Sequence, residues 1–292
     1  MEMIGVCTDS HSSITRDEAK RLGVRVLPMP FYIGENCYLE DVSISRAEFL
    51  EKLAGGADVS TSQPSPAAVM EFWDEALAEF EQIVYIPISS GLSGSCAAAQ
   101  VLALEDKYDG RVFVVDNGRV SAPQHRAVLD ALELVSEGYT AAEIKEILEA
   151  SRAEMAVYIG VETLTYLKKG GRISPAAAAL GTVLNIKPVL KLDVGTLDTF
   201  QKCRGFGKAK KVMLEAVHQD LETRWKEYHE RGEAYLLAAS SASPEATEEW
   251  VREIREEFPD MEVLCDELSL GVSCHIGPGG LGIACSCRPK RP

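Results

Sequence analysis

Hydroxyl-bearing residues and glycines are concentrated in four short segments that we predict to be loops. In open α/β sheets, ligands bind at the carboxyl ends of strands, where such loops lie. The sequence therefore predicts one ligand site built from these four segments: Thr8–Ser13, Ser60–Ser65, Ser89–Ser95 and Ser273–Gly280.

The third segment is the most informative. It follows the apolar run Ile83–Ile88 and leads into the small-residue, helix-compatible run Cys96–Leu104. Backbone N–H groups at a helix N-terminus attract anions, and the Ser93 hydroxyl would point the same way. Capping and turn formation alone are the alternative explanation for any one such segment. Taken together, the segments predict that Thr61, Ser93 and His275 hold a carboxylate or a phosphate.

Enzymatic alternatives use some of the same residues. Gly91–Ser95 falls one residue short of the G-x-S-x-G elbow of hydrolases, and a Ser93–His275 pair would need an acid such as Asp9. A hydrolase acting on a lipid or acyl ester is therefore the second hypothesis. The sequence contains no G-x-x-x-x-G-K-[ST] motif, so we expect no ATP cradle of P-loop type. We expect a binding protein without catalytic residues.

Eight cysteines raise the question of disulfides or metal, but no Cys-x-x-Cys occurs. Cys274, His275, Cys285 and Cys287 form the one suspicious cluster, and the single-residue gap between Cys285 and Cys287 is a poor chelating spacing. We expect free thiols packed as small hydrophobic groups, with no metal and no other cofactor.

Charge and length exclude other classes of protein. The 292 residues carry 30 Lys and Arg against 45 Asp and Glu, a formal charge of −15, which disfavours nucleic-acid binding. No apolar stretch reaches the roughly 18–20 residues of a membrane span, and the first residues do not resemble a leader. We expect a cytoplasmic protein without stable membrane insertion.

The order of apolar runs and helical patterns predicts an α/β fold in two domains, divided near residue 154. Residues 1–154 should form a doubly wound parallel-sheet domain, and residues 155–292 a smaller mixed α+β domain, with the ligand between them. Strands are predicted at Met3–Cys7, Val24–Pro30, Ile83–Ile88, Arg111–Val115, Ala156–Val161, Lys187–Leu192 and Ala234–Ala239. Helices are predicted after the caps Ser65-Pro66, Thr140 and Ser243-Pro244.

The second half contains two further features that bear on a ligand. Ser174-Pro175 opens the helical pattern Ala176–Leu184, which is apolar almost all round and should line a tunnel together with Leu164. Before it, Gly170-Gly171 allows close backbone approach beside Arg172, whose guanidinium can bind a carboxylate or phosphate at two points. A basic stretch follows at Lys202, Arg204, Lys208, Lys210 and Lys211.

At its loops the sequence resembles the DegV family, whose fatty-acid-binding members are FakB-like proteins. The matching pieces run in family order from end to end, and the block from Leu164 to Leu190 is the most specific. They are Thr8-Asp9-Ser10, Thr61–Ser65, Ser89–Gly94, Tyr166–Ser174, Leu184–Pro188 and His275–Gly282.

The resemblance implies a long-chain fatty acid held between the two domains, with its carboxylate on Thr61, Ser93 and His275 and with Ser62 and Gly94 in the same loops. It also implies a partner, a separate ATP-using fatty-acid kinase subunit that converts the bound acid to an acyl phosphate for phospholipid synthesis. Arg172 and Arg204 are expected to contact the ligand or this partner, and catalysis comes from the partner.

Overall fold

The computed structural model describes residues 3–40, 42–175, 186–192, 195 and 197–291. Its first part is built on a parallel sheet in the order β2-β1-β6-β7. The four predicted segments of this sheet form strands, which confirms the parallel α/β architecture. The strands are β1 (Ile4–Asp9), β2 (Arg25–Leu27), β6 (Gln82–Ile86) and β7 (Val112–Val114).

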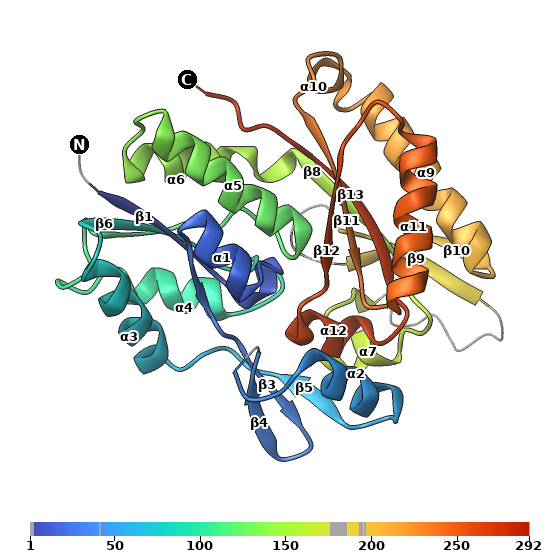
Figure 1. Cartoon of the computed structure of the whole chain (residues 1–292), viewed down its shortest axis with the longest axis horizontal. Coiled ribbons are helices and arrows are strands. Elements are labelled where there is room, and N and C mark those ends of the chain that lie inside the picture. Colours follow the sequence, from blue (N-terminus) through green and yellow to red (C-terminus); the bar gives the residue numbers. More distant parts are fainter. Residues whose placement is uncertain (1–2, 41, 176–185, 193–194, 196, 292) are drawn as a thin grey trace.

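Helices cover both faces of the parallel sheet (Figure 1). Side chains alternate along β6, so that Val84 and Ile86 pack toward one helical layer while Ile83 and Tyr85 pack toward the other. The first layer contains α1 (Arg16–Leu22), α5 (Ala122–Ser136) and α6 (Ala141–Ala150), and the second contains α3 (Pro66–Leu77) and α4 (Ser95–Leu102). This is the doubly wound arrangement expected from strands that are apolar on both faces.

Local capping chemistry fixes three helices where the sequence predicted them. The Ser65 side chain accepts from the Ala68 N–H at the start of α3, and Ser243 does the same for Ala246 at the start of α11 (Pro244–Glu257). Thr140 forms the complete capping box of α6 with Glu143.

The second part is built on a six-stranded mixed sheet in the order β10-β9-β8-β13-β11-β12. Only the β11–β12 pair is parallel among the pairs of this sheet. One face packs against α9 (Phe206–Glu222), α10 (Lys226–Glu230) and α11, and the other face turns toward the first part (Figure 1). The strands are β8 (Met155–Gly160), β9 (Ile186–Leu192), β10 (Leu197–Arg204), β11 (Ala234–Ser240), β12 (Val263–Glu267) and β13 (Leu281–Cys287).

A small antiparallel sheet, absent from the sequence predictions, lies between the two larger sheets at the bottom of Figure 1. It contains β3 (Pro30–Ile33), β4 (Asn36–Leu39) and β5 (Val59–Thr61). The helix α2 (Arg46–Ala54) lies between β4 and β5 in the sequence. The predicted strand Val24–Pro30 was wrong in its extent, because the chain leaves β2 at Pro28 and enters β3 at Pro30. Proline donates no ladder hydrogen bond, and the Met29 N–H between the two prolines binds Ser10 Oγ at 3.1 Å instead.

The remaining predictions about architecture have different outcomes. The apolar helix predicted at 176–184 lies outside the described residues. The domain boundary near residue 154, immediately before β8, stays a prediction. Among the described residues, no helix is long and apolar enough to span a membrane.

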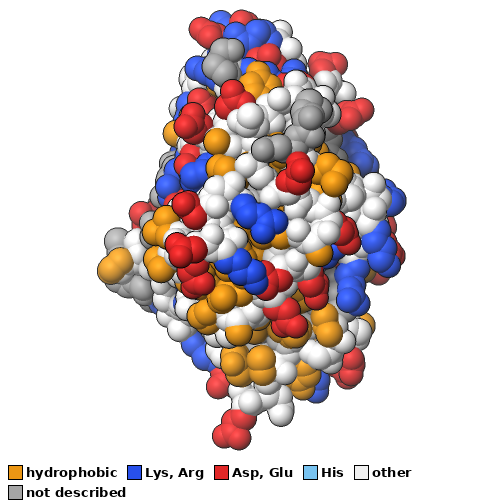
Figure 2. Space-filling model, turned by 90° about the vertical axis from the view of Figure 1, so that its left-hand side faces the viewer, with side chains coloured by type: hydrophobic (Ala, Val, Ile, Leu, Met, Phe, Trp, Pro, Cys, Tyr) orange, Lys and Arg blue, Asp and Glu red, His pale blue; other side chains and the backbone are white. Residues whose placement is uncertain are grey.

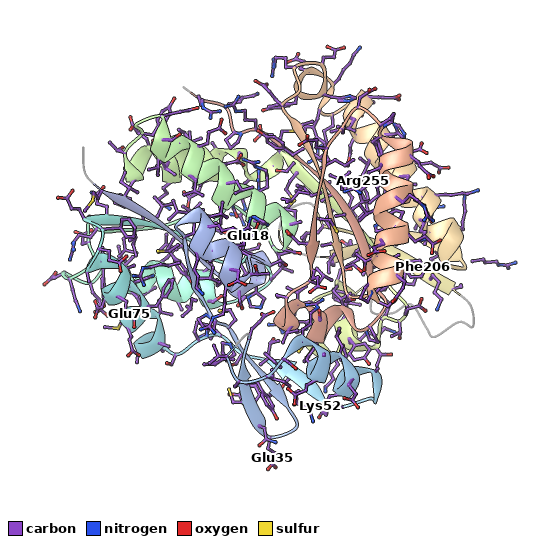
Figure 3. The ribbon with its side chains drawn as sticks, in the orientation of Figure 1. Glu18, Glu35, Lys52, Glu75, Phe206 and Arg255 are labelled. Carbon is purple, nitrogen blue, oxygen red and sulfur yellow. The ribbon has the colours of Figure 1, made fainter. Side chains whose placement is uncertain are left out.

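The surface carries charges of both signs. On the face drawn in Figure 2, Lys and Arg side chains are interspersed with Asp and Glu side chains. Charged and polar side chains project outward around the ribbon, as Glu35 does at the tip of the β3–β4 hairpin in Figure 3.

Candidate functional site

A cavity of about 190 Å³ lies between the carboxyl end of the parallel sheet and the open face of the six-stranded sheet. A single buried water needs only about 10–15 Å³ measured in this way, so the cavity is large enough for an extended organic ligand. Much of its wall is apolar, and the sheet face contributes Val157, Ile159, Leu192, Leu237 and Ala239.

Polar side chains from distant parts of the chain line the same cavity. Six of the seven predicted ligand-site residues, all except Arg204, line this cavity. The members are Thr61 at the end of β5, Ser62 after it, Ser93 and Gly94 before α4, Arg172 after α7 (Thr165–Gly170), and His275 in α12 (Leu270–Ile276).

Thr61 and His275 form the best-defined contact of this polar group. Thr61 Oγ1 and His275 Nε2 are 2.8 Å apart, although the residues are 214 positions apart in sequence. Burial, followed by the positive charge of Arg172, lowers the pKa of His275 from 6.5 to about 4, so the imidazole is neutral near pH 7. Its Nδ1 is buried and has no hydrogen-bond partner among the residues that the structure describes.

Gly170 explains why the ring of His275 fits in this place. A Cβ atom added to Gly170 would lie 2.0 Å from His275 Nδ1, far inside van der Waals contact. The backbone of α7 and the imidazole ring therefore pack together only because residue 170 has no side chain.

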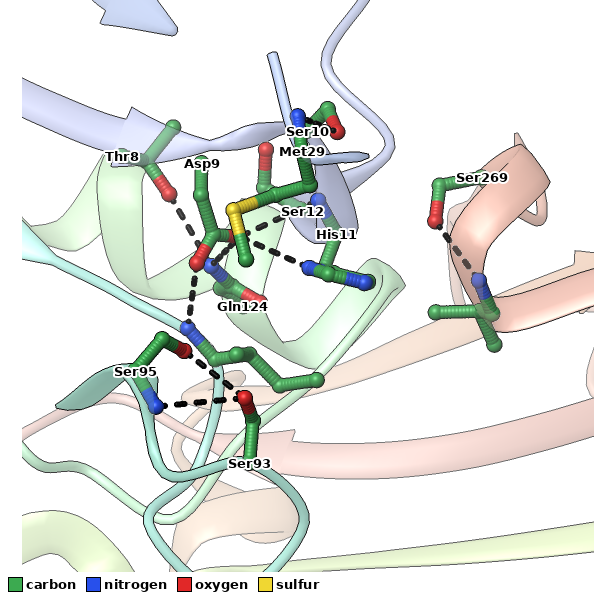
Figure 4. Close-up of polar contacts among 12 residues, drawn as sticks. Thr8, Asp9, Ser10, His11, Ser12, Met29, Ser93, Ser95, Gln124 and Ser269 are labelled. Atoms are coloured by element: carbon green, nitrogen blue, oxygen red, sulfur yellow. Dashed lines mark hydrogen bonds and ion pairs between the residues drawn. The ribbon is translucent and has the colours of Figure 1, made fainter. Parts of the chain in front are cut away.

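Ser93 and Gly94 lie at the start of α4, as the sequence predicted (Figure 4). Ser93 Oγ accepts a hydrogen bond from the Ser95 N–H at 3.2 Å and lies 2.9 Å from Ser95 Oγ. Gly94 has no side chain to contribute, and a Cβ there would lie 2.9 Å from Gln63 Oε1, which also lines the cavity. The loop after β5 and the loop before α4 thus meet at the cavity.

The two predicted arginines lie in different environments. Arg172 is half-buried at the cavity, and its Nε donates to the Leu92 carbonyl at 3.2 Å while Nη1 donates to the Gly170 carbonyl. Arg204 is exposed on β10, at the edge of the six-stranded sheet, and is not among the residues that line the cavity. Leu164, predicted to line a tunnel, packs in the core beside Leu167 but is also not among the described lining residues.

One prediction about the site was wrong in its secondary structure. The segment Ser273–Gly280 was predicted as a loop, but its first four residues form the last turns of α12. Ser269 caps this helix by accepting from the Val272 N–H at 3.2 Å, and Gly277, with φ of +77°, ends it. The loop was predicted from the glycines after residue 276, and the capping residue Ser269 lies before the predicted segment.

The described contacts do not assemble a Ser93–His275–Asp9 triad. Ser93 Oγ contacts Ser95, and His275 Nε2 contacts Thr61. The Asp9 carboxylate accepts from the N–H groups of Ile88 and His11 and from Gln124 (Figure 4). The hydrolase hypothesis therefore has no geometric support among these residues.

Three polar lining residues were not predicted as site residues: His11, Gln63 and Ser121. His11 and Gln63 belong to the hydroxyl-rich segments, so their positions beside Ser10 and Ser62 were an available signal. Ser121 has a positive φ of 56°, a conformation that local sequence patterns do not predict for a serine.

Within the described residues, no group of three or more His, Cys, Asp and Glu side chains is arranged to hold a metal ion. Cys274, Cys285 and Cys287 are buried free thiols, and burial raises the pKa of Cys274 to about 12. A neutral thiol is a poor metal ligand.

Comparison with known proteins identifies relatives along nearly the whole chain. A family model described as an uncharacterised protein of the DegV family matches residues 3–288. A DegV domain-containing protein of Deinococcus radiodurans is 33% identical over 282 residues, covering 96% of this chain and 97% of the relative.

Solved structures share the fold as well. A structure from Thermus thermophilus, described as fatty acid binding of a DegV family protein, is 34% identical and has a TM-score of 0.85, with 98% of this chain and 99% of that chain covered. A stearic acid-binding protein from Eubacterium ventriosum has a TM-score of 0.87 at 22% identity, with 98% and 99% covered. At that identity the second comparison supports the fold alone.

Proposed function

Because the chain belongs to the DegV family, we propose that it binds a long-chain fatty acid by its carboxylate and presents the acid to a separate fatty-acid kinase. The observation that carries the proposal is a cavity with extensive apolar walls and a group of hydrogen-bond donors at Thr61, Ser93 and Arg172. The Thermus thermophilus relative described as fatty acid binding is 34% identical, which supports the ligand class.

The hydrogen-bond pattern around Thr61 suits a carboxylate, which only accepts hydrogen bonds. The Nδ1 atom of His275 is buried against Gly170 and finds no hydrogen-bond partner in the described part of the chain, so the less costly tautomer carries its proton on Nε2. In that tautomer Nε2 donates to Thr61 Oγ1, and the Thr61 hydroxyl hydrogen is left to donate to the ligand.

Arg172 supplies the positive charge for the carboxylate. Its Nε and Nη1 are committed to backbone carbonyls, so Nη2 remains as the donor for a ligand. The N–H groups at the start of α4 add a favourable dipole beside Ser93. Charge-assisted hydrogen bonds contribute about 1.5–3 kcal/mol each, enough to make single deletions measurable.

The acyl chain would occupy the apolar part of the cavity. Burial of each CH₂ group contributes roughly 0.8 kcal/mol, so a chain of 16 to 18 carbons, on the order of a dozen or more buried CH₂ groups, offsets the ordering cost of binding. Alternating residues of β8 and β11 form this apolar surface. It lies on the face of the six-stranded sheet opposite to the face that packs against α9.

Docking of the kinase is proposed at the basic residues of β10 and of the start of α9. Lys202, Arg204, Lys208 and Lys211 are exposed there, in a chain of net charge −15. Lys210, included in the predicted basic stretch, instead pairs with Glu253 at 2.8 Å and is only 15% exposed. Opposite-sign steering by the four exposed residues would weaken as salt increases.

The test of fatty-acid binding is an oleate titration of the folded Ser93→Ala variant. We expect its affinity to fall about tenfold or more, the effect of one charge-assisted hydrogen bond. Ser243→Ala is the matched control, because Ser243 caps α11 away from the cavity and should affect stability alone. Unchanged oleate affinity in folded Ser93→Ala would contradict the assigned role.

The kinase step needs its own test. The protein is incubated with oleate, ATP and Mg²⁺, with and without a fatty-acid kinase subunit, and acyl phosphate is measured. Product only with the kinase subunit supports presentation of the acid. Product without it would make this chain an enzyme, and esterase turnover lost in Ser93→Ala would restore the hydrolase hypothesis.

A further inference from the structure

A second histidine lies on the cavity wall apart from the carboxylate donors. His11 follows β1 in a short 3-10 turn, is 6% exposed and lines the cavity. Its Nε2 lies 2.7 Å from the place of a Cβ on Gly271, the second residue of α12. Gly271 lies four residues before His275 in α12. His11 therefore contacts this helix about 6 Å along its axis from His275.

Neither ring nitrogen of His11 makes a hydrogen bond to the described residues. Nδ1 is buried and makes no hydrogen bond to the described residues, and its nearest charged neighbour is Asp9 Oδ1 at 3.5 Å. The adjacent residue Ser121 also lines the cavity, and its N–H binds the His11 carbonyl at 2.8 Å. A purely hydrocarbon chain against this wall would leave a polar nitrogen unsatisfied, which is unfavourable for a buried group.

The buried carboxylate of Asp9 decides which nitrogen carries the proton. Asp9 is fully buried and held in place by the N–H groups of Ile88 at 2.8 Å and His11 at 3.0 Å. When the ring carries a single proton, the nearby carboxylate favours that proton on the nearer nitrogen, Nδ1. Nε2 is then a lone-pair acceptor, so the group that binds it must donate a hydrogen.

We propose that His11 Nε2 accepts a hydrogen bond from a hydroxyl group on the bound acyl chain, close to its carboxylate end, so that the cavity prefers hydroxylated fatty acids. This inference rests on the proposed fatty-acid function. A carboxylate cannot supply the hydrogen that Nε2 requires, which separates this contact from the Thr61 and Arg172 donors. The distance of about one helical turn from His275 favours a hydroxyl in the first few carbons over one in mid-chain.

The experiment compares ligands on the unaltered protein. Stearate, beta-hydroxystearate and a stearate hydroxylated in mid-chain are titrated by calorimetry at pH 7.5. We expect beta-hydroxystearate to bind about five- to tenfold more tightly than stearate, the effect of one net hydrogen bond, and the mid-chain isomer to gain nothing. Because this comparison needs no variant, it stands even if substitutions at His11 fail to fold.

The His11→Leu variant then assigns the preference to its residue. We expect this variant to lose the preference, so that stearate and beta-hydroxystearate bind to it with equal affinity. His229→Leu, the same change at an exposed histidine of α10, should keep the preference.

Three results overturn the inference. They are equal affinity of the unaltered protein for stearate and beta-hydroxystearate, a preference that persists in His11→Leu, and a loss of affinity for both acids in that variant, which would make His11 a carboxylate contact. If stearate binds without any preference, only this inference fails. If neither acid binds, the proposed fatty-acid function fails with it.

Discussion

Replacement of Gly170 by alanine tests whether the position of His275 controls ligand binding. The new Cβ would lie 2.0 Å from Nδ1, whereas ordinary contact begins at 3.4 Å, so the ring must move by more than an ångström. Such a shift breaks the 2.8 Å contact with Thr61 and releases the Thr61 hydroxyl from its orientation. Loss of one hydrogen bond of about 1.4 kcal/mol corresponds to a tenfold loss of affinity for oleate.

The effect of Gly170→Ala on stability combines two opposing terms. Overpacking costs about 1–3 kcal/mol, while alanine in a helix gains up to about 1 kcal/mol over glycine. We therefore expect net destabilisation of at most about 3 kcal/mol, measured by urea denaturation, together with the loss of oleate affinity. Affinity and stability equal to those of the unaltered protein would refute the packing argument.

Gly207→Ala is the matched control for this prediction. Gly207 lies in the first turn of α9, and a Cβ there meets no heavy atom within 4 Å. The control should gain about 0.4–1 kcal/mol of stability through the unfolded state and bind oleate normally. A loss of affinity in Gly207→Ala would mean that the titration reports general damage and not the site.

Three further predictions concern the same cavity. Because the pKa of His275 is lowered from 6.5 to about 4, the unfolded chain binds a proton between these pH values that the folded chain does not bind. The free energy of unfolding should therefore fall by up to about 3 kcal/mol as the pH falls from 6.5 toward 4. Urea denaturation at pH 7.5 and 5 should show a smaller fall in His275→Gln than in the unaltered protein. Gly91→Ala would place its Cβ 2.2 Å from the backbone of Gly195, so we expect lower thermal stability, and an unchanged melting temperature would contradict the contact. Arg172→Ala should weaken oleate binding about tenfold or more, whereas Arg204→Ala should leave it unchanged. Equal oleate affinities of the two variants would contradict the assignment of Arg172 to the ligand.

Much of the fold followed from local sequence patterns. Ser65, Thr140 and Ser243 each cap a helix through a bond to a residue three positions later, so a short window contains all of the information. The strands of the parallel sheet are apolar on both faces, and their pattern predicts cover by helices on both sides without knowledge of the partner strands.

The small sheet and the buried position of α12 could not be predicted in the same way. β3, β4 and β5 are each three or four residues long and pair with one another, and such short strands leave little periodicity to detect. The buried position of α12 depends on contacts far away in sequence, since the Glu40 carboxylate accepts from the Leu270 N–H and Arg46 donates to the Leu268 carbonyl.

The resemblance to the DegV family, carried by the loop motifs, is confirmed by the family match over residues 3–288. These motifs contain Thr61, Ser93 and His275, and the cavity brings all three together. Their proposed roles stay predictions, because shared motifs identify which residues meet and do not establish what each one binds.

His11 shows why local sequence patterns do not determine which loop residues contact a ligand. A hydroxyl or histidine in a loop can serve a cap, a turn or a ligand, and the sequence does not tell which of these partners is present. Only the arrangement in space shows that Ile88 and Gln124 occupy the Asp9 carboxylate while the neighbouring ring of His11 reaches the cavity without a hydrogen-bond partner among the described residues. The unsatisfied nitrogen, and not the residue type, is what indicates a ligand hydroxyl, so the ligand preference of this protein depends on contacts that the linear sequence does not contain.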